Sequence, residues 1–168
     1  MWNVALISGV DGASGAEELH GAPMELDLLY NEIDKLYHAY ARGCGLSGCA
    51  YWMLYDLVLA GGELPLTRLT ASWSYSKQTI NSALKSLQAR GYVELSFVEG
   101  SRKSKLAQLT NAGRAFSEEH IEPAILAERR AFETLDLEEQ RMLVRLVRCY
   151  ADALEAQITA CGANAPNT

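Results

Sequence analysis

The sequence predicts a mainly α-helical (α+β) fold that contains one small sheet. Apolar residues recur at helical spacing along most of the 168 residues, and only one short region alternates apolar with polar residues as a half-buried strand does. Hydrophobic residues make up 49% and charged residues 21% of the chain, close to the globular average, which excludes a disordered or collagen-like protein. The uncharged stretch at residues 43–55 is too short and too rich in glycine to span a bilayer, so we expect no membrane association.

The N-terminal region predicts a flexible tail over residues 1–23, which contain several glycines and no sustained periodicity. Met24 opens directly onto the first helical pattern, so residues 1–23 are either a mobile tail or lie upstream of the true start; the sequence does not decide between the two. The first residues lack the basic region of a secretory signal. Four irregularly spaced cysteines without an export signal then indicate reduced thiols and a cytoplasmic protein. They are Cys44, Cys49, Cys149 and Cys161.

Two helices come next. From Leu26 to Tyr40, apolar residues lie at helical spacing between charged ones, and Gly43 ends this helix. Ser47 is a good N-cap for a second helix over residues 48–60, which is apolar almost all round. Because so short a helix carries so little charge, it must be buried on most sides.

A short third helix and a capped fourth helix follow. Pro65 suits a first helical turn, and Leu66, Leu69 and Trp73 would form the buried face of the third helix. Ser76 can cap the fourth helix. In that helix apolar residues at helical spacing point inward, and the opposite face is polar. The inward residues are Ile80, Ala83, Leu84 and Leu87, and the polar ones are Lys77, Gln78, Asn81, Ser82 and Lys85.

After the fourth helix, the spacing of apolar residues changes from helical to alternating, which indicates a hairpin. Residues 92–97 alternate apolar and polar, residues 99–104 are polar and turn-forming, and residues 106–109 can return as the partner strand. The short loop fits antiparallel pairing. This predicts a two-stranded β-hairpin with a basic tip.

Two long helices close the chain. The first covers about residues 111–134 and is expected to bend at Pro123, which removes an interior N–H. The second begins after Asp136, whose side chain can cap it. The side chain of Glu139, three residues later, can accept a hydrogen bond from the backbone of Asp136 in return. Residues 162–168 are expected to form a flexible tail.

The charge is distributed unevenly. The chain carries a net charge of −6, yet residues 65–114 hold eight basic and two acidic residues, a local charge of +6 that leaves −12 on the remainder. Attraction to phosphate depends on local potential, so this asymmetry is typical of a DNA-binding lobe on an acidic scaffold. A solvated basic face is the alternative explanation.

The order of these elements is that of a winged helix-turn-helix between flanking helices. The chain resembles the MarR family of bacterial transcription regulators through two segments, SYSKQTINSALKSLQARGYVE (residues 74–94) and KLAQLTNAGRAF (residues 105–116). The second segment contains the family's Leu-Thr-x-x-Gly at the start of the fifth helix. The resemblance covers about residues 24–160.

The resemblance implies a homodimer that binds a double-stranded DNA operator with palindromic symmetry. The N-terminal helix in residues 24–47 and the C-terminal helices in residues 111–161 would dimerise, and residues 48–110 would form the DNA-binding domain. The fourth helix would enter the major groove and the hairpin the flanking minor groove.

The residue types support DNA binding on their own. Gln78 and Asn81 are amides that pair bidentately with adenine, and Lys77 and Lys85 can reach guanine or phosphate. Hydroxyls near a helix N-terminus can contact phosphate. The predicted DNA-binding residues are Ser76, Lys77, Gln78, Thr79, Asn81, Ser82, Lys85, Ser101, Arg102, Lys103 and Lys105.

One position departs from the family pattern. Many members carry Asp-x-Arg at the hairpin tip, where this chain has Ser101-Arg102-Lys103. Lysine lacks the planar fork of arginine, so we expect Arg102 to take over the minor-groove contact.

The family also implies a small aromatic or phenolic effector bound between the dimer helices and the winged domain. Tyr37, Tyr40 and Trp52 could line its pocket, and core packing is the alternative explanation for each of them. His38 and His120 could be metal ligands or pH switches, but His38 fits a surface or interface position better.

An enzyme is poorly supported. The chain has no glycine-rich phosphate loop, no nucleophile elbow and no metal-spaced His/Glu set, so we expect neither catalysis nor a metal or cofactor. The cysteines could form a redox sensor, and Cys149 does follow Arg145 and Arg148; small buried residues are the simpler explanation.

The sequence therefore predicts a sequence-specific, homodimeric transcription regulator, a repressor that a small ligand releases from DNA. Two alternatives stay open: a winged-helix module that binds another protein, and a cysteine-based redox-sensing regulator.

Overall fold

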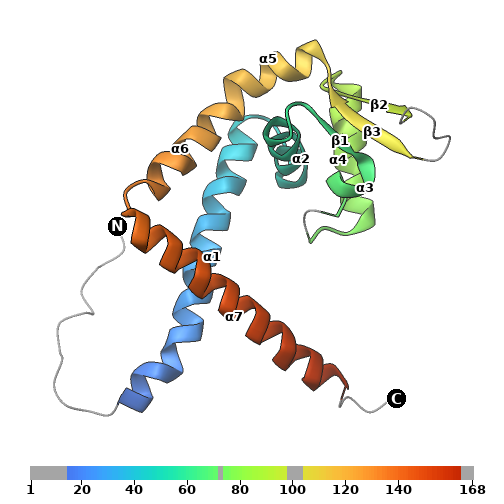
Figure 1. Ribbon diagram of the computed structural model, residues 1–168. Helices are drawn as coiled ribbons and strands as arrows, with labels where there is room; N and C mark the ends of the chain where they lie inside the picture. The colour runs from blue at the N-terminus through green and yellow to red at the C-terminus, as the bar shows by residue number, and fades with distance from the viewer. Residues whose placement is uncertain (1–14, 72–73, 98–103, 164–168) are drawn as a thin grey trace.

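The computed structural model describes residues 15–71, 74–97 and 104–163 (Figure 1). The chain forms seven helices and three strands within these ranges. They are α1 (Gly15–Gly43), α2 (Gly48–Leu59), β1 (Glu63–Pro65), α3 (Leu66–Leu69), α4 (Lys77–Ala89), β2 (Val93–Phe97), β3 (Lys105–Leu109), α5 (Asn111–His120), α6 (Glu122–Phe132) and α7 (Leu137–Ala163).

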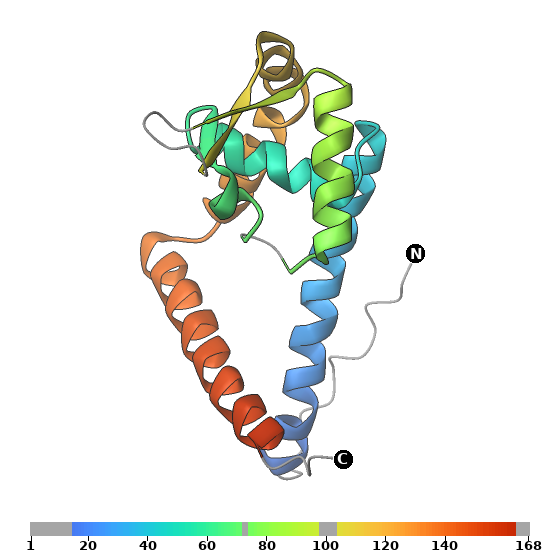
Figure 2. The ribbon, with the colours of Figure 1, turned by 90° about the vertical axis from the view of Figure 1, so that its right-hand side faces the viewer.

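The elements form one lobe with two long helices that extend away from it. Helices α2 to α5 and the sheet make up the lobe, and α1 and α7 run out below it in both Figure 1 and Figure 2. Helix α7 buries none of its described side chains. None of the helices in the described part combines the length and apolar character needed to cross a membrane.

Helix α2 lies at the centre of the core, as its almost uniformly apolar sequence predicted. Tyr51, Met53, Leu54 and Leu57 are fully buried. The four inward residues predicted for α4 are all buried too, and α4 packs against α2. The apolar pattern therefore predicted the packing of the lobe correctly.

The predicted helix caps are present. The Ser47 hydroxyl accepts a hydrogen bond from the Ala50 N–H at 3.2 Å. At α7, Asp136 Oδ1 accepts from the N–H of Glu139 at 2.9 Å, and Glu139 Oε2 accepts from the N–H of Asp136 at 2.8 Å. This reciprocal pair is the capping box that the sequence predicted.

The sheet has three strands in the order β1-β3-β2, so the prediction of a two-stranded hairpin was incomplete. The missed strand β1 is three residues long and ends at Pro65, which pairs with Leu106 and does not begin the α3 helix. A proline can occupy an edge strand because its missing N–H is not needed there. Polar side chains link the strands: Gln108 donates to Glu63 and accepts from Ser96, each at 3.0 Å.

Two helix boundaries also differ from the prediction. Helix α1 begins at Gly15, so the predicted tail over residues 1–23 was wrong for residues 15–23. A helix that already continues from Met24 can add turns at its end without a new nucleation cost, even through glycine. Helix α7 reaches Ala163, past the expected start of the C-terminal tail. Residues 1–14, Trp73 and residues 164–168 lie outside the described residues.

The predicted bend near Pro123 is a one-residue interruption at Ile121, which separates two helices. Helix α5 ends at His120, and α6 begins at Glu122 with Pro123 in its first turn. A proline in a first turn loses no hydrogen bond, because the N–H groups there have no partner within the helix. The proline therefore starts a helix here.

The structure gives a physical reason for the Leu-Thr-x-x-Gly segment. Thr110 caps α5: its Oγ1 accepts from the Gly113 N–H at 3.0 Å and donates to the Gly91 carbonyl at 2.5 Å. A Cβ on Gly113 would overlap the carbonyl oxygen of Tyr92. The motif thus fixes α5 against the start of β2, and only glycine fits at its last position.

Gly113→Ala is expected to destabilise the protein by about 3 kcal/mol, because backbone atoms would have to move apart to admit the methyl group. Gly43→Ala is the matched control, since a Cβ on Gly43 meets no atom within 4 Å. Thermal unfolding measures both. Equal midpoints for the two variants would contradict this account of the motif.

Candidate nucleic-acid interface

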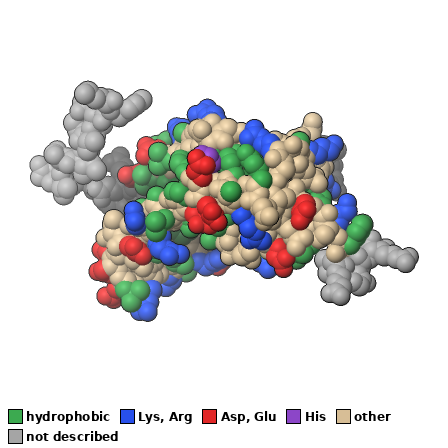
Figure 3. All heavy atoms as spheres, turned by 90° about the horizontal axis from the view of Figure 1, so that it is seen from above, with side chains coloured by type: hydrophobic (Ala, Val, Ile, Leu, Met, Phe, Trp, Pro, Cys, Tyr) green, Lys and Arg blue, Asp and Glu red, His purple; other side chains and the backbone are tan. Residues whose placement is uncertain are grey.

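The predicted reading face of α4 is exposed to solvent. Ile80, Ala83, Leu84 and Leu87 anchor the helix on the core, which turns the opposite side outward. The exposed residues on or next to that side are Ser76, Lys77, Gln78, Thr79, Asn81, Ser82 and Lys85. This face carries two lysines and no acidic residue. In Figure 3, by contrast, the side of the molecule seen from above mixes acidic, basic and hydrophobic side chains.

Ser76 and Thr79 fix the N-terminus of α4. The Ser76 hydroxyl accepts from the Thr79 N–H at 3.1 Å, and the two hydroxyls lie 2.9 Å apart. The predicted Ser76 cap is confirmed. The N–H groups of the first turn point away from the helix, which makes this end suitable for an anion such as phosphate.

The base of the hairpin adds one more cation. Lys105 is exposed at the start of β3, and its ammonium lies 5.9 Å from the centre of the Phe97 ring on β2. Phe97 itself is 62% exposed. Sequence reasoning did not single out Phe97, which the observed strand register places across from Lys105. The tip residues Ser101, Arg102 and Lys103 lie outside the described residues.

The three residues predicted to line an effector pocket come together, but as packed side chains. The rings of Tyr37 and Trp52 lie 4.6 Å apart, and the Tyr40 hydroxyl donates to the His120 carbonyl at 2.8 Å. Burial, followed by the carboxylate of Glu128, raises the pKa of Tyr37 to about 12. Tyr55 donates to that carboxylate at 2.6 Å. No spacing signal in the sequence identified Glu128.

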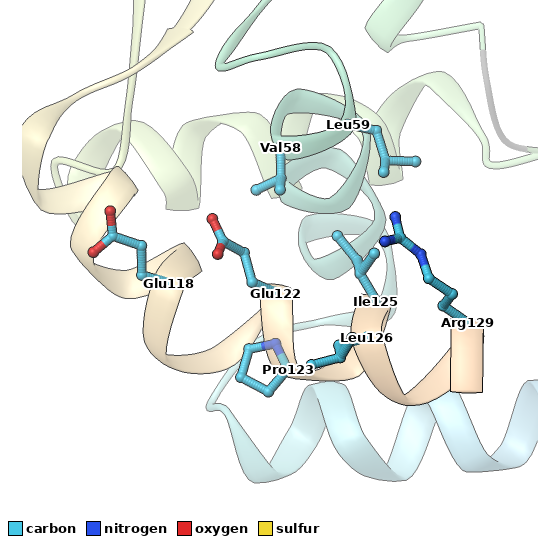
Figure 4. A pocket seen from close by; sticks show the side chains of 8 residues that line it. All are labelled: Val58, Leu59, Glu118, Glu122, Pro123, Ile125, Leu126 and Arg129. Atoms are coloured by element: carbon cyan, nitrogen blue, oxygen red, sulfur yellow. The ribbon is translucent and has the colours of Figure 1, made fainter. Parts of the chain in front are cut away.

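A groove lies elsewhere, between α2 and the α5–α6 pair. Its volume is about 530 Å³. In Figure 4, Ile125 and Arg129 rise from α6 toward Val58 and Leu59 of α2. The lining residues are Val58, Leu59, Glu118, Glu122, Pro123, Ile125, Leu126 and Arg129. The groove is therefore apolar along α2, with charged side chains along α5 and α6.

The four cysteines differ in their exposure to solvent. Burial raises the pKa of the Cys44 and Cys49 thiols, which disfavours the thiolate. Cys149 and Cys161 are exposed on α7. His38 pairs with Asp34 on α1, with Nε2 and Oδ2 3.2 Å apart. Among the described residues, no three potential metal ligands lie close enough together to hold an ion.

Solved structures of bacterial regulators share this fold, although no protein-family model and no curated protein matches the chain. A MarR family regulator from Neisseria meningitidis is similar with a TM-score of 0.69 and 24% identity, over 81% of this chain and 95% of that chain. A MarR family regulator from Silicibacter pomeroyi is 27% identical with a TM-score of 0.56, over 74% of this chain and 86% of that chain. An organohalide-sensing transcriptional regulator, solved with 2,4-dichlorophenol bound, is similar with a TM-score of 0.59 and 12% identity, over 88% of this chain and 89% of that chain.

These neighbours are transcriptional regulators, and their fold matches that of this chain over most of its length. The predicted mainly α-helical winged fold is confirmed. This chain has the winged-helix fold of MarR family regulators of known structure.

Proposed function

We propose that the protein is a homodimeric, sequence-specific DNA-binding regulator in the cytoplasm, which represses from a palindromic operator. The observation that carries the proposal is α4: a capped helix, anchored on the core by its apolar side, that presents amides and lysines outward. An α-helix of this kind fits the major groove of B-DNA.

The side chains of α4 divide into two roles. Gln78 and Asn81 read adenine through paired hydrogen bonds, and Lys77 and Lys85 bind guanine or phosphate. Ser76, Thr79 and Ser82 contact the backbone, helped by the N–H groups of the first turn.

The hairpin contributes contacts beside the major groove. Lys105 binds phosphate from the exposed start of β3. Ser101, Arg102 and Lys103 reach the flanking minor groove, whose negative potential attracts a cation. Arg102 makes the main contact there, because its guanidinium can form the fork that Lys103 cannot.

A second copy of the chain would cover the apolar faces of α1 and α7. Ile33 and Leu36 of α1 are 52% and 70% exposed, and Leu146 and Ile158 of α7 are 52% and 62% exposed. Rows of exposed aliphatic side chains on long helices mark an interaction surface. A two-fold symmetric pair would also match the symmetry of a palindrome, with the two α4 helices about 34 Å apart.

Release from DNA would follow from a change in that separation. A small aromatic or phenolic effector would bind more tightly to a dimer whose α4 helices are differently spaced than to the DNA-binding dimer. The loss of operator affinity cannot exceed the difference between the effector's binding free energies for these two forms. The support is the phenol bound to a regulator of the same fold. In this chain the effector would bind either beside Tyr37, Tyr40 and Trp52 or in the groove along α2.

Gel shifts over a salt series, with DNA from upstream of the coding region and a scrambled duplex, test the proposal. Tight palindrome-dependent binding with a steep salt dependence is expected, because lysine–phosphate contacts release counterions. Weak binding that does not depend on sequence, together with a selection from genomic fragments that recovers no preferred site, would favour a protein-interaction module. Binding that mild oxidant abolishes, and that Cys149→Ser protects, would favour a redox sensor.

Asn81→Ala is expected to lose about 1–3 kcal/mol of discrimination per half-site, since it removes a bidentate base contact. Gln88→Ala is the matched control, an exposed amide at the far end of the same helix. The ratio of affinities for operator and scrambled DNA measures the effect. A ratio unchanged by Asn81→Ala would show that this face does not read bases.

Leu146→Glu is expected to shift the protein from dimer to monomer at micromolar concentration, because a charge would be buried in the interface. Ala156→Glu, exposed on the other side of α7, should leave the dimer intact. Sedimentation equilibrium distinguishes the two variants. A Leu146→Glu dimer as tight as wild type would place the interface elsewhere.

A further inference from the structure

The two ends of α4 lie beside the connection between α1 and α2 and the first residue of α2. At the C-terminal end, Arg90 donates from Nη2 to the Gly45 carbonyl at 2.8 Å. At the N-terminal end, Tyr75 directly precedes the cap residue Ser76 and packs against the buried core. Gly45 belongs to the four-residue connection and Gly48 is the first residue of α2, so α4 is attached at both ends to one short segment.

The N-terminal attachment is a close contact of three elements at Gly48. The position that a Cβ on Gly48 would take lies 3.3 Å from Oη of Tyr75 and 2.6 Å from the imidazole of His38. Glycine therefore leaves the space in which His38, from α1, and Tyr75, from the segment before α4, approach α2. The absence of a side chain at Gly48 is what lets α1 come this near to the start of α4.

The surroundings of the phenol agree with this geometry. Burial raises the pKa of Tyr75, and electrostatic interactions with Cys49 and Asp34 raise it further. Asp34 is the residue that pairs with His38 one turn away on α1. The Tyr75 hydroxyl thus lies among groups from α1 and from the first turn of α2.

Helix α1 connects this contact to the proposed dimer face. Ile33 and Leu36 are exposed on the same stretch of helix that carries Asp34 and His38. A continuous helix moves as a rigid element over one or two turns, so a shift at Ile33 also displaces His38. The buried side of α4 holds the helix against α2, and the contacts at Gly45 and Gly48 add restraints at its two ends.

We infer that Tyr75 and Arg90 are positioning residues that attach the two ends of α4 to the end of α1, so that the dimer face sets the separation of the two recognition helices. The inference rests on the proposed function and names residues outside the DNA-reading face. Neither residue needs to touch DNA for the attachment to act.

Operators with altered spacing test this inference. Duplexes carry two half-sites at the natural separation or one base pair further apart, and a third duplex carries a single half-site. For wild type we expect a strong preference for the natural separation. Tyr75→Leu, Arg90→Gln and Gly48→Ala should each reduce that preference by roughly tenfold. Affinity for the single half-site and the thermal midpoint should stay close to wild type.

The controls separate positioning from simple loss of structure. Gly43→Ala adds the same methyl group at the other end of the connection, where no atom lies within 4 Å, and it should keep the full spacing preference. Gly48→Ala and Tyr75→Leu act on one contact, so the double variant should be no worse than the single ones. Equal loss of affinity on all three duplexes would indicate damage to the fold and would overturn the inference, as would an unchanged spacing preference.

A measurement without DNA keeps this test apart from that of the proposed function. Spin labels at Gln88→Cys, with Cys44, Cys149 and Cys161 replaced by serine, report the distance between the two α4 helices in the dimer. A narrow distribution that Tyr75→Leu and Arg90→Gln broaden supports the attachment, even if wild type shows no sequence preference and the regulator proposal fails. A distribution that these variants leave unchanged, or one already broad in wild type, overturns it.

Discussion

The burial of α2 is the constraint on which the rest of the lobe depends. Its sequence offers water almost no polar face, so other elements must cover it, and each fully buried leucine stabilises the fold by about 2 kcal/mol. Helix α4 covers one side of α2, α1 and α6 lie along others, and β1 and α3 pack near its C-terminal end. The amphipathic pattern of α4 then has one solution, with Ile80 and Leu84 inward and Asn81 outward.

The same packing explains how an acidic chain can present a surface suited to DNA. The net charge is −6, but the acidic residues lie mostly on the helices outside the lobe, and the exposed side of α4 has none. Charges beyond about 8–10 Å are screened at physiological salt, so a phosphate close to Lys77 responds to the lobe and much less to α7.

Patterns local in sequence predicted most of the fold, and contacts distant in sequence account for what was missed. The caps at Ser47, Ser76 and Asp136 follow from residues within one turn, and all three are present. Strand β1 could not be predicted that way, because three residues ending in Pro65 acquire strand geometry only by pairing with residues 106–108. The Tyr55–Glu128 bond and the approach of Tyr75 to Gly48 join positions far apart in the chain. The sequence predicted which side of α4 faces outward, but not what holds its two ends.

Attachment at the ends matters because base recognition tolerates little displacement. A hydrogen bond from Asn81 to a base weakens steeply beyond about 3.2 Å, so a shift of α4 by an ångström or two is enough to lose a bidentate contact. If α4 could slide on α2, it would absorb a change at the dimer face and keep both half-sites occupied. With Tyr75 and Arg90 attached to the α1–α2 connection, α4 has to follow α1. A ligand that moves α1 slightly would then reduce operator affinity without unfolding any element, and the loss would be limited only by its preference for the displaced dimer.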